Sequence, residues 1–181
     1  LGWQIGAAAL VLIAAARPGW GALRYLGLDR RPHRREVVLA IGGLVALALP
    51  YNAVVMIVAR EAAMADLRPF AEGLGGPVPW LLAVIVCLGA PLAEELLFRG
   101  FLLPALARSR LGFPVGALLA TAGWAALHTG YSIWGLLEIF LIGLYLSWVF
   151  KQTRNLWVPI ACHAAYNSLL TGLLAAGVLT P

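Results

Sequence analysis

The sequence predicts an all-α protein that lies in a membrane as a polytopic bundle of about six transmembrane helices. Hydrophobic residues make up 62% of the 181 residues, and charged residues only 12%. Soluble domains contain roughly 45–50% apolar and about 25% charged residues. A soluble fold of this length has no room to bury so much apolar surface, so the surplus is expected to face lipid. We expect one transmembrane domain over residues 1–181.

Six apolar segments are predicted to span the bilayer, because a helix needs about 20 mostly apolar residues to cross the hydrocarbon core. They cover residues 3–16, 36–59, 79–106, 113–129, 132–150 and 155–178. Prolines within them are expected to kink helices or mark their ends. These prolines are Pro50, Pro91, Pro104, Pro114 and Pro159. The stretch 60–78 mixes charged and apolar residues, which fits either an interfacial amphipathic helix or an ordered loop.

The net charge of +5 does not indicate nucleic-acid binding, because the basic residues lie in short loops between apolar segments. Lys and Arg gather after the first, third and fifth segments and are sparse elsewhere. By the positive-inside rule these loops are cytoplasmic, and both ends of the chain face away from the cytoplasm. The basic residues concerned are Arg17, Arg24, Arg30, Arg31, Arg34, Arg35, Arg108, Arg110, Lys151 and Arg154. We therefore expect a multi-pass protein of a prokaryotic cell membrane, with the lipid bilayer as its partner.

Several ionisable and amide side chains fall inside the apolar segments, where they are costly and mark functional sites. They are Glu94, Glu95, Arg99, His128, Glu138 and His163, with the amides Asn52 and Asn167. Glu95 and Arg99 are four residues apart and share a helix face, so Arg99 is expected to pair with Glu95. Glu94 is rotated by about 100° from that face. The two glutamates are therefore expected to differ in role, with Glu94 suited to act as a general base.

The fourth and sixth segments add further groups. His128 follows Trp124 by four residues, so the two share a face near the end of the fourth segment. His163 and Asn167 are also four residues apart, and they could donate hydrogen bonds to one developing oxyanion. Alternatively, Glu94 and the two histidines could bind a metal ion such as zinc. Glu138 in the fifth segment is expected to line a cavity or to belong to a hydrogen-bond network.

Three motifs occur in this order in separate segments: Glu-Glu-x-x-x-Arg, an aromatic-x-x-x-His and His-x-x-x-Asn. Over about residues 79–170 this arrangement resembles the CPBP family, which comprises type II CAAX prenyl endopeptidases and bacteriocin-processing or self-immunity relatives, also labelled Abi. The family often has Phe where this chain has Trp124. The resemblance implies a helical bundle whose cavity opens toward the cytoplasm. It also implies site roles for six residues, which are Glu94, Glu95, Arg99, His128, His163 and Asn167.

In those implied roles, Glu94 activates water with His128 as its partner, and His163 with Asn167 stabilises the oxyanion. Glu95 and Arg99 support the site. We therefore expect an intramembrane endopeptidase that acts without a cofactor on a peptide or protein, prenylated or not. Zinc is less favoured because the chain lacks a His-Glu-x-x-His helix. Two alternatives stay open: a non-catalytic immunity or scaffold protein, and a proton-coupled transporter, which usually has two related halves that this chain lacks.

Overall fold

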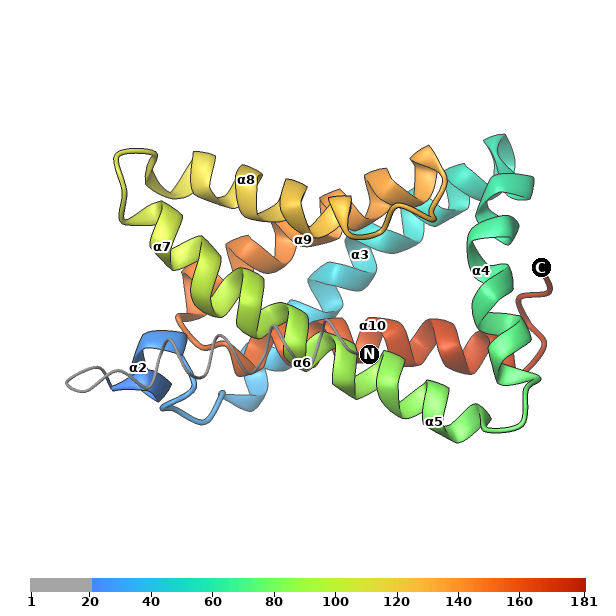
Figure 1. Cartoon of the computed structure of the whole chain (residues 1–181), viewed down its shortest axis with the longest axis horizontal. Helices are drawn as coiled ribbons and strands as arrows, with labels where there is room; N and C mark the ends of the chain where they lie inside the picture. The colour runs from blue at the N-terminus through green and yellow to red at the C-terminus, as the bar shows by residue number, and fades with distance from the viewer. Residues whose placement is uncertain (1–20) are drawn as a thin grey trace.

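The computed structural model describes residues 21–181, and over this range the chain is all-α with seven helices. Two short or crosswise helices, α2 (Ala22–Leu26) and α4 (Arg60–Leu74), accompany the longer ones. The longer helices are α3 (Arg34–Val58), a continuous helix over Pro79–Ala107, α8 (Gly112–Ala126), α9 (Ile133–Thr153) and α10 (Trp157–Ala175). They run along one another, whereas α4 crosses their ends beside the C-terminus (Figure 1).

Within residues 21–181, four helices are long and apolar enough to cross a membrane. They are Arg34–Val58, Pro79–Ala107, Ile133–Thr153 and Trp157–Ala175, with mean hydropathies of 2.1, 2.1, 1.9 and 1.2. Helix α8 is apolar but has only 15 residues, because it ends three residues before the predicted boundary. The predicted segment 3–16 lies outside the described residues. The six-span prediction is thus supported at four segments, and the chain is a multi-pass membrane protein.

The helix over Pro79–Ala107 is interrupted by two π-helical stretches. Its parts are α5 (Pro79–Val84), η1 (Ile85–Gly89), α6 (Ala90–Glu95), η2 (Leu96–Leu102) and α7 (Leu103–Ala107). Each π stretch ends two residues before a proline, Pro91 or Pro104. Proline lacks a donor and clashes with the carbonyl four residues earlier, and a wider turn accommodates both defects. The two prolines therefore stay inside one helix, and the glutamates lie between the π stretches.

Helix α4 confirms that the stretch after α3 is helical. It packs against α3, α5, α9 and α10. Asp66 fixes it to the start of α9, since its two carboxylate oxygens accept the backbone N–H and the hydroxyl of Ser132, each at 2.7 Å. The same Ser132 hydroxyl accepts the backbone N–H of Gly135 at 3.2 Å and so caps α9. One serine thus joins two helices at this end of the molecule.

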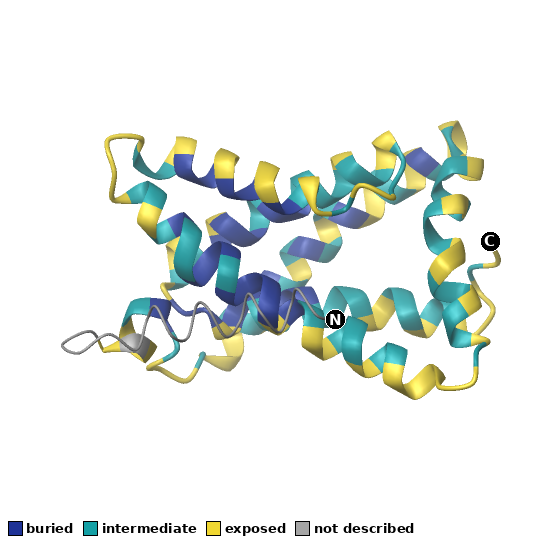
Figure 2. Cartoon of the chain, viewed as in Figure 1, coloured by how far each residue is buried: buried dark blue, intermediate teal, exposed yellow. Residues whose placement is uncertain are grey.

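The opposite end carries the basic loops, and we call it the basic-loop end. Nine Lys and Arg residues lie there, in the segments 24–35, 108–110 and 151–154. Hydrogen bonds join the first segment to the residues just after the third: the Gly27 carbonyl accepts from the Leu156 backbone at 2.8 Å, and the Asn155 amide donates to the Arg30 carbonyl at 3.1 Å. Buried residues gather in the middle and toward this end, whereas the α4 end is largely intermediate or exposed (Figure 2). We call the α4 end the cavity end.

Candidate active site

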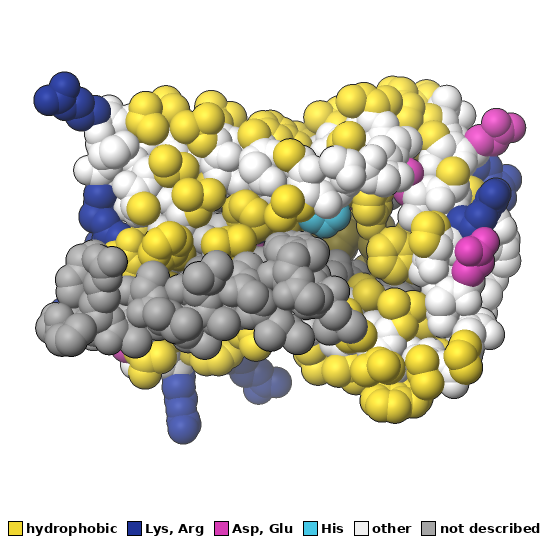
Figure 3. Space-filling view, in the orientation of Figure 1, with side chains coloured by type: hydrophobic (Ala, Val, Ile, Leu, Met, Phe, Trp, Pro, Cys, Tyr) yellow, Lys and Arg dark blue, Asp and Glu magenta, His cyan; other side chains and the backbone are white. Residues whose placement is uncertain are grey.

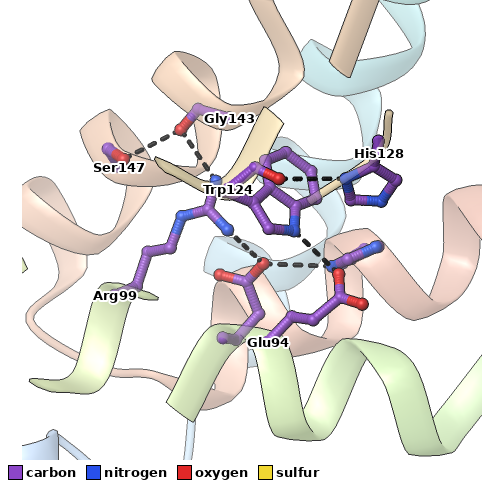
Figure 4. A network of polar contacts seen from close by, with 8 residues as sticks. Glu94, Arg99, Trp124, His128, Gly143 and Ser147 are labelled. Atoms are coloured by element: carbon purple, nitrogen blue, oxygen red, sulfur yellow. Dashed lines mark hydrogen bonds and ion pairs between the residues drawn. The ribbon is translucent and has the colours of Figure 1, made fainter. Parts of the chain in front are cut away.

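Glu95 and Arg99 form the ion pair expected from their spacing. An Arg99 terminal nitrogen donates to Glu95 Oε1 at 2.8 Å, and both residues are fully buried. The other terminal nitrogen donates to the Gly143 carbonyl of α9 at 3.1 Å, and the guanidinium lies 4.4 Å from the centre of the Trp124 ring (Figure 4). This buried ion pair therefore connects the Pro79–Ala107 helix to α8 and α9.

Glu94, the neighbouring residue, points to a different partner. Its Oε2 accepts a hydrogen bond from the indole Nε1 of Trp124 at 2.7 Å, and the residue is 4% exposed (Figure 4). From the sequence we expect only aromatic packing from Trp124, so its role as a hydrogen-bond donor to Glu94 was missed. The available signal was the indole N–H itself, which usually finds an acceptor when it is buried. A Phe, common at this position in the CPBP family, has no such donor.

The two histidines both lie against Trp124, with their rings edge-on to it and 5.4 Å between ring centroids in each case. His128 lies in the turn after α8, and its Nδ1 is 3.0 Å from the Trp124 carbonyl oxygen. A carbonyl only accepts, so Nδ1 carries the proton and Nε2 of the neutral ring is an acceptor. His163 Nδ1 lies 3.0 Å from Glu95 Oε1, which fixes the ring of α10 in the same way.

Asn167 shares a helix face with His163, as predicted, but it bonds to another element. Its Nδ2 donates to the Val86 carbonyl in η1 at 2.8 Å. One of the two amide hydrogens is thereby used, and the second is available for another acceptor. Asn167 is thus oriented by the π stretch that precedes the glutamates.

A cavity of about 440 Å³ brings most of these residues together. Glu94, His128, His163 and Asn167 all line it, together with Trp124. Glu95 and Arg99 do not line it, since they are buried behind these residues. The sequence therefore identified four residues of one cavity wall and two residues that support it.

Two further residues of the cavity wall are Glu138 and Tyr131, of which Tyr131 was not predicted from the sequence. Glu138 lines the cavity, and its Oε1 accepts hydrogen bonds from the Asn52 amide and the Tyr166 hydroxyl. Glu138 thus fulfils both expectations for it, the cavity lining and the hydrogen-bond network. Tyr131, in the turn before α9, packs edge-on to His128 with 5.7 Å between ring centroids. Burial raises the pKa of Tyr131 to about 12, so its hydroxyl stays protonated at neutral pH.

The cavity lies away from the basic loops. Its wall is formed by α4, the second half of α3, the first half of α9, the part of α10 from His163 onward and the first half of the Pro79–Ala107 helix. Lys and Arg side chains gather mainly around the other end, although α4 carries Arg60 and Arg68, and a hollow is visible beside α4 (Figure 3). A cytoplasmic location of the basic loops and a cytoplasmic opening of the cavity are therefore not compatible in this structure. The side of the membrane on which the cavity opens stays a prediction.

Comparison with known proteins identifies the family. A family model described as type II CAAX prenyl endopeptidase Rce1-like matches residues 76–169, more than half of the chain. The chain belongs to this Rce1-like family. The resemblance to the CPBP family, based on three motifs, is thereby confirmed. The matched region contains all six residues predicted for the site and the whole Pro79–Ala107 helix.

A more specific relative adds little functional information. Over 134 residues the chain is 26% identical to the UPF0177 protein YxdF of Lactococcus lactis subsp. lactis (strain IL1403). The aligned residues cover 71% of this chain and 67% of that protein. No solved structure matches the chain. Membership in the Rce1-like family suggests a protease, and the geometry of the site has to carry the argument further.

The donor set does not favour a metal centre. Among residues 21–181 no three His, Cys, Asp or Glu side chains are grouped so that they could hold a metal ion. We therefore derive no step of the reaction through a metal.

Proposed function

We propose that this chain is an intramembrane endopeptidase in which Glu94 activates a water molecule for attack on a peptide carbonyl. The supporting observation is the convergence of Glu94, His128, His163 and Asn167, from three separate elements, on one cavity of about 440 Å³. Carboxylate, imidazole and amide groups provide a base, a proton carrier and oxyanion donors. Membership in the Rce1-like family points to the same class of reaction.

In the first step Glu94 takes a proton from water while the water oxygen bonds to the scissile carbonyl carbon. The second O–H of this water donates a hydrogen bond to Nε2 of His128, because the Nδ1 proton of that ring is held by the Trp124 carbonyl. The indole N–H of Trp124 keeps the Glu94 carboxylate directed at the water. The result is a tetrahedral intermediate with a negative oxygen and a protonated Glu94.

In the second step the C–N bond breaks and Glu94 returns its proton to the leaving amine. The oxyanion accepts a hydrogen bond from the second N–H of Asn167 and one from His163 Nε2. His163 can donate through Nε2 only as imidazolium, since Glu95 already holds its Nδ1 proton. The Glu95 carboxylate stabilises that charged ring, while Arg99 holds Glu95 in place.

We further propose that the cavity faces the side of the membrane away from the cytoplasm. The nine Lys and Arg residues of the basic-loop end support this orientation by the positive-inside rule. The substrate is then a peptide or a segment of a membrane protein that reaches the cavity past α4. Leu170, Leu173 and Leu174 form an apolar part of the wall that also suits a prenyl chain.

The decisive experiment is cleavage of a peptide library by the purified full-length protein and by its Glu94→Gln variant. Glutamine still accepts the Trp124 hydrogen bond but cannot take a proton, so we expect a loss of at least about 100-fold in rate. The matched control is Glu72→Gln, because Glu72 is exposed on α4 and does not line the cavity. Prenylated and unprenylated peptides are compared in parallel.

Three results would overturn the proposal. Undiminished cleavage by Glu94→Gln would remove Glu94 from the reaction. A complete lack of cleavage by the folded wild-type protein across the library would favour the non-catalytic immunity or scaffold protein. Activity lost to a strong chelator and restored only by zinc would replace the glutamate base with a metal-dependent mechanism.

A further inference from the structure

A second polar group lies in the cavity wall, apart from the residues that act on water. Glu138 of α9 meets Asn52 of α3 and Tyr166 of α10, and all three residues line the cavity. The Asn52 amide and the Tyr166 hydroxyl both donate to the same carboxylate oxygen, Oε1. Within residues 21–181, Oε2 takes part in no hydrogen bond. The carboxylate is thus fixed by one oxygen and offers the other to a ligand.

Joining three helices does not require a charge at this position. Glutamine has the same length as glutamate, and its side-chain carbonyl would accept the same two hydrogen bonds. A carboxylate is more expensive than an amide inside a membrane bundle, because its desolvation has to be compensated by a cation or by further donors. The interhelical contact therefore explains Asn52 and Tyr166, but it does not explain why a carboxylate rather than an amide stands at Glu138.

The charge of the whole cavity wall points to a cationic ligand. The wall contains three carboxylates, Asp66, Glu94 and Glu138, and no Lys or Arg from the described part of the chain. Asp66 already accepts two hydrogen bonds from Ser132, and Glu94 accepts one from Trp124. His163 is directed to Glu95. Asp66 uses both of its oxygens on Ser132 and Glu94 serves the proposed hydrolysis, so Glu138 is the carboxylate of this wall with an oxygen available for an incoming charge.

We propose that Glu138, held by Asn52 and Tyr166, forms a subsite that binds a Lys or Arg side chain of the substrate and so selects peptides with a basic residue near the scissile bond. This inference rests on the proposed endopeptidase function and names its substrate class. A cationic side chain entering the cavity would lie in a region of low dielectric, where attraction to a carboxylate is much stronger than in water. Asn52 and Tyr166 act as positioning residues, since they touch Glu138.

The test uses the purified full-length protein and pairs of peptides chosen from the cleaved members of the library. In each pair, one peptide has lysine at the position near the scissile bond where the cleaved peptides carry a basic residue, and the other has norleucine there. Norleucine keeps the aliphatic side chain and removes the charge. We expect the wild-type KM to be at least tenfold lower for the lysine peptide. Glu138→Gln is expected to abolish this difference and Glu138→Asp to retain part of it. Glu72→Gln, which removes the same charge outside the cavity, should leave it unchanged.

A binding measurement covers the case in which Glu138→Gln does not fold. The Glu94→Gln protein, which binds without cleaving, should bind the lysine peptide at least tenfold more tightly than the norleucine peptide. Equal affinities there, equal wild-type KM values, or a lysine preference that survives in Glu138→Gln would each overturn the subsite. If the subsite fails in this way but Glu94→Gln abolishes cleavage, the proposed endopeptidase function stands without the subsite. If Glu94→Gln cleaves normally, the endopeptidase mechanism itself fails.

Discussion

The two ends of the molecule use polar residues in opposite ways. Toward the basic-loop end, Glu95 and Arg99 are fully buried among packed side chains and form an ion pair at 2.8 Å. At the cavity end, Glu94 and Glu138 accept hydrogen bonds from neutral donors, Trp124 in one case and Asn52 with Tyr166 in the other, and both face a hollow of about 440 Å³. We therefore expect the carboxylate paired with a buried cation to stabilise the fold, and the carboxylates held by neutral donors beside the cavity to serve the proposed chemistry.

The strongest way to break this contrast is to remove the cation of the packed region. Arg99→Met leaves Glu95 as a buried charge without its partner, and breaking such a pair typically costs about 3–5 kcal/mol. We expect a large drop in the melting temperature of the detergent-solubilised protein. The control is Arg108→Met, because the Arg108 guanidinium lies over the Tyr25 ring on an exposed surface and contributes roughly 0.5–1 kcal/mol. Equal losses for the two variants would contradict a special role for the buried pair.

A smaller perturbation tests how tightly the packed region positions the site. An added Cβ at Gly143 would lie 2.6 Å from Thr121 Cγ2, 2.9 Å from the Trp124 ring and 3.0 Å from an Arg99 terminal nitrogen. Gly143→Ala should therefore cost about 1–3 kcal/mol through overpacking and should lower peptide cleavage, because Trp124 holds Glu94.

The matched variant for Gly143→Ala is Gly42→Ala in α3. No heavy atom of the described residues would lie within 4 Å of the new Cβ there. Alanine is the better helix former by roughly 0.5–1 kcal/mol, so this variant should be neutral or slightly stabilising and fully active. Thermal melting and cleavage of one peptide measure both variants. A harmless Gly143→Ala would mean that the contacts around Trp124 are loose.

The gentlest test asks on which side of the membrane each end lies. Single cysteines are placed at Ala65 on α4 and at Gln152 near the end of α9, both exposed, after Cys87 and Cys162 are replaced by serine. A membrane-impermeant maleimide should label Ala65→Cys in intact cells and Gln152→Cys only after permeabilisation. The reverse pattern would place the cavity on the cytoplasmic side, as the family resemblance implies.

Much of the fold was predictable because its signals are local. Long apolar stretches predicted α3, α9, α10 and the Pro79–Ala107 helix to within a few residues. The Glu95–Arg99 pair follows from a four-residue spacing on one helix. Family membership was predictable as well, since the three motifs keep their order and lie in separate helices.

The rest depends on contacts between distant segments. Nothing local indicates that the Trp124 indole reaches Glu94, 30 residues earlier, or that Asp66 binds Ser132, 66 residues later. The π stretches arise from the way two prolines are accommodated, which no hydrophobic pattern records. The sequence indicated a cavity only through the family resemblance. Where the cavity lies depends on which halves of the helices separate when α4 packs across their ends.

The shortness of α8 has a consequence for the surrounding lipid. Its 15 residues extend for about 22 Å, whereas the hydrocarbon core of a bilayer is roughly 30 Å thick. Such hydrophobic mismatch is relieved when the bilayer thins around the short helix. Helix α8 ends at the cavity, in the turn that contains His128. The backbone N–H groups that follow are satisfied there, since Tyr131 donates to the His128 carbonyl and Ser132 donates to Asp66. On this flank the interface should dip toward the site, which shortens the path for water and for a peptide chain.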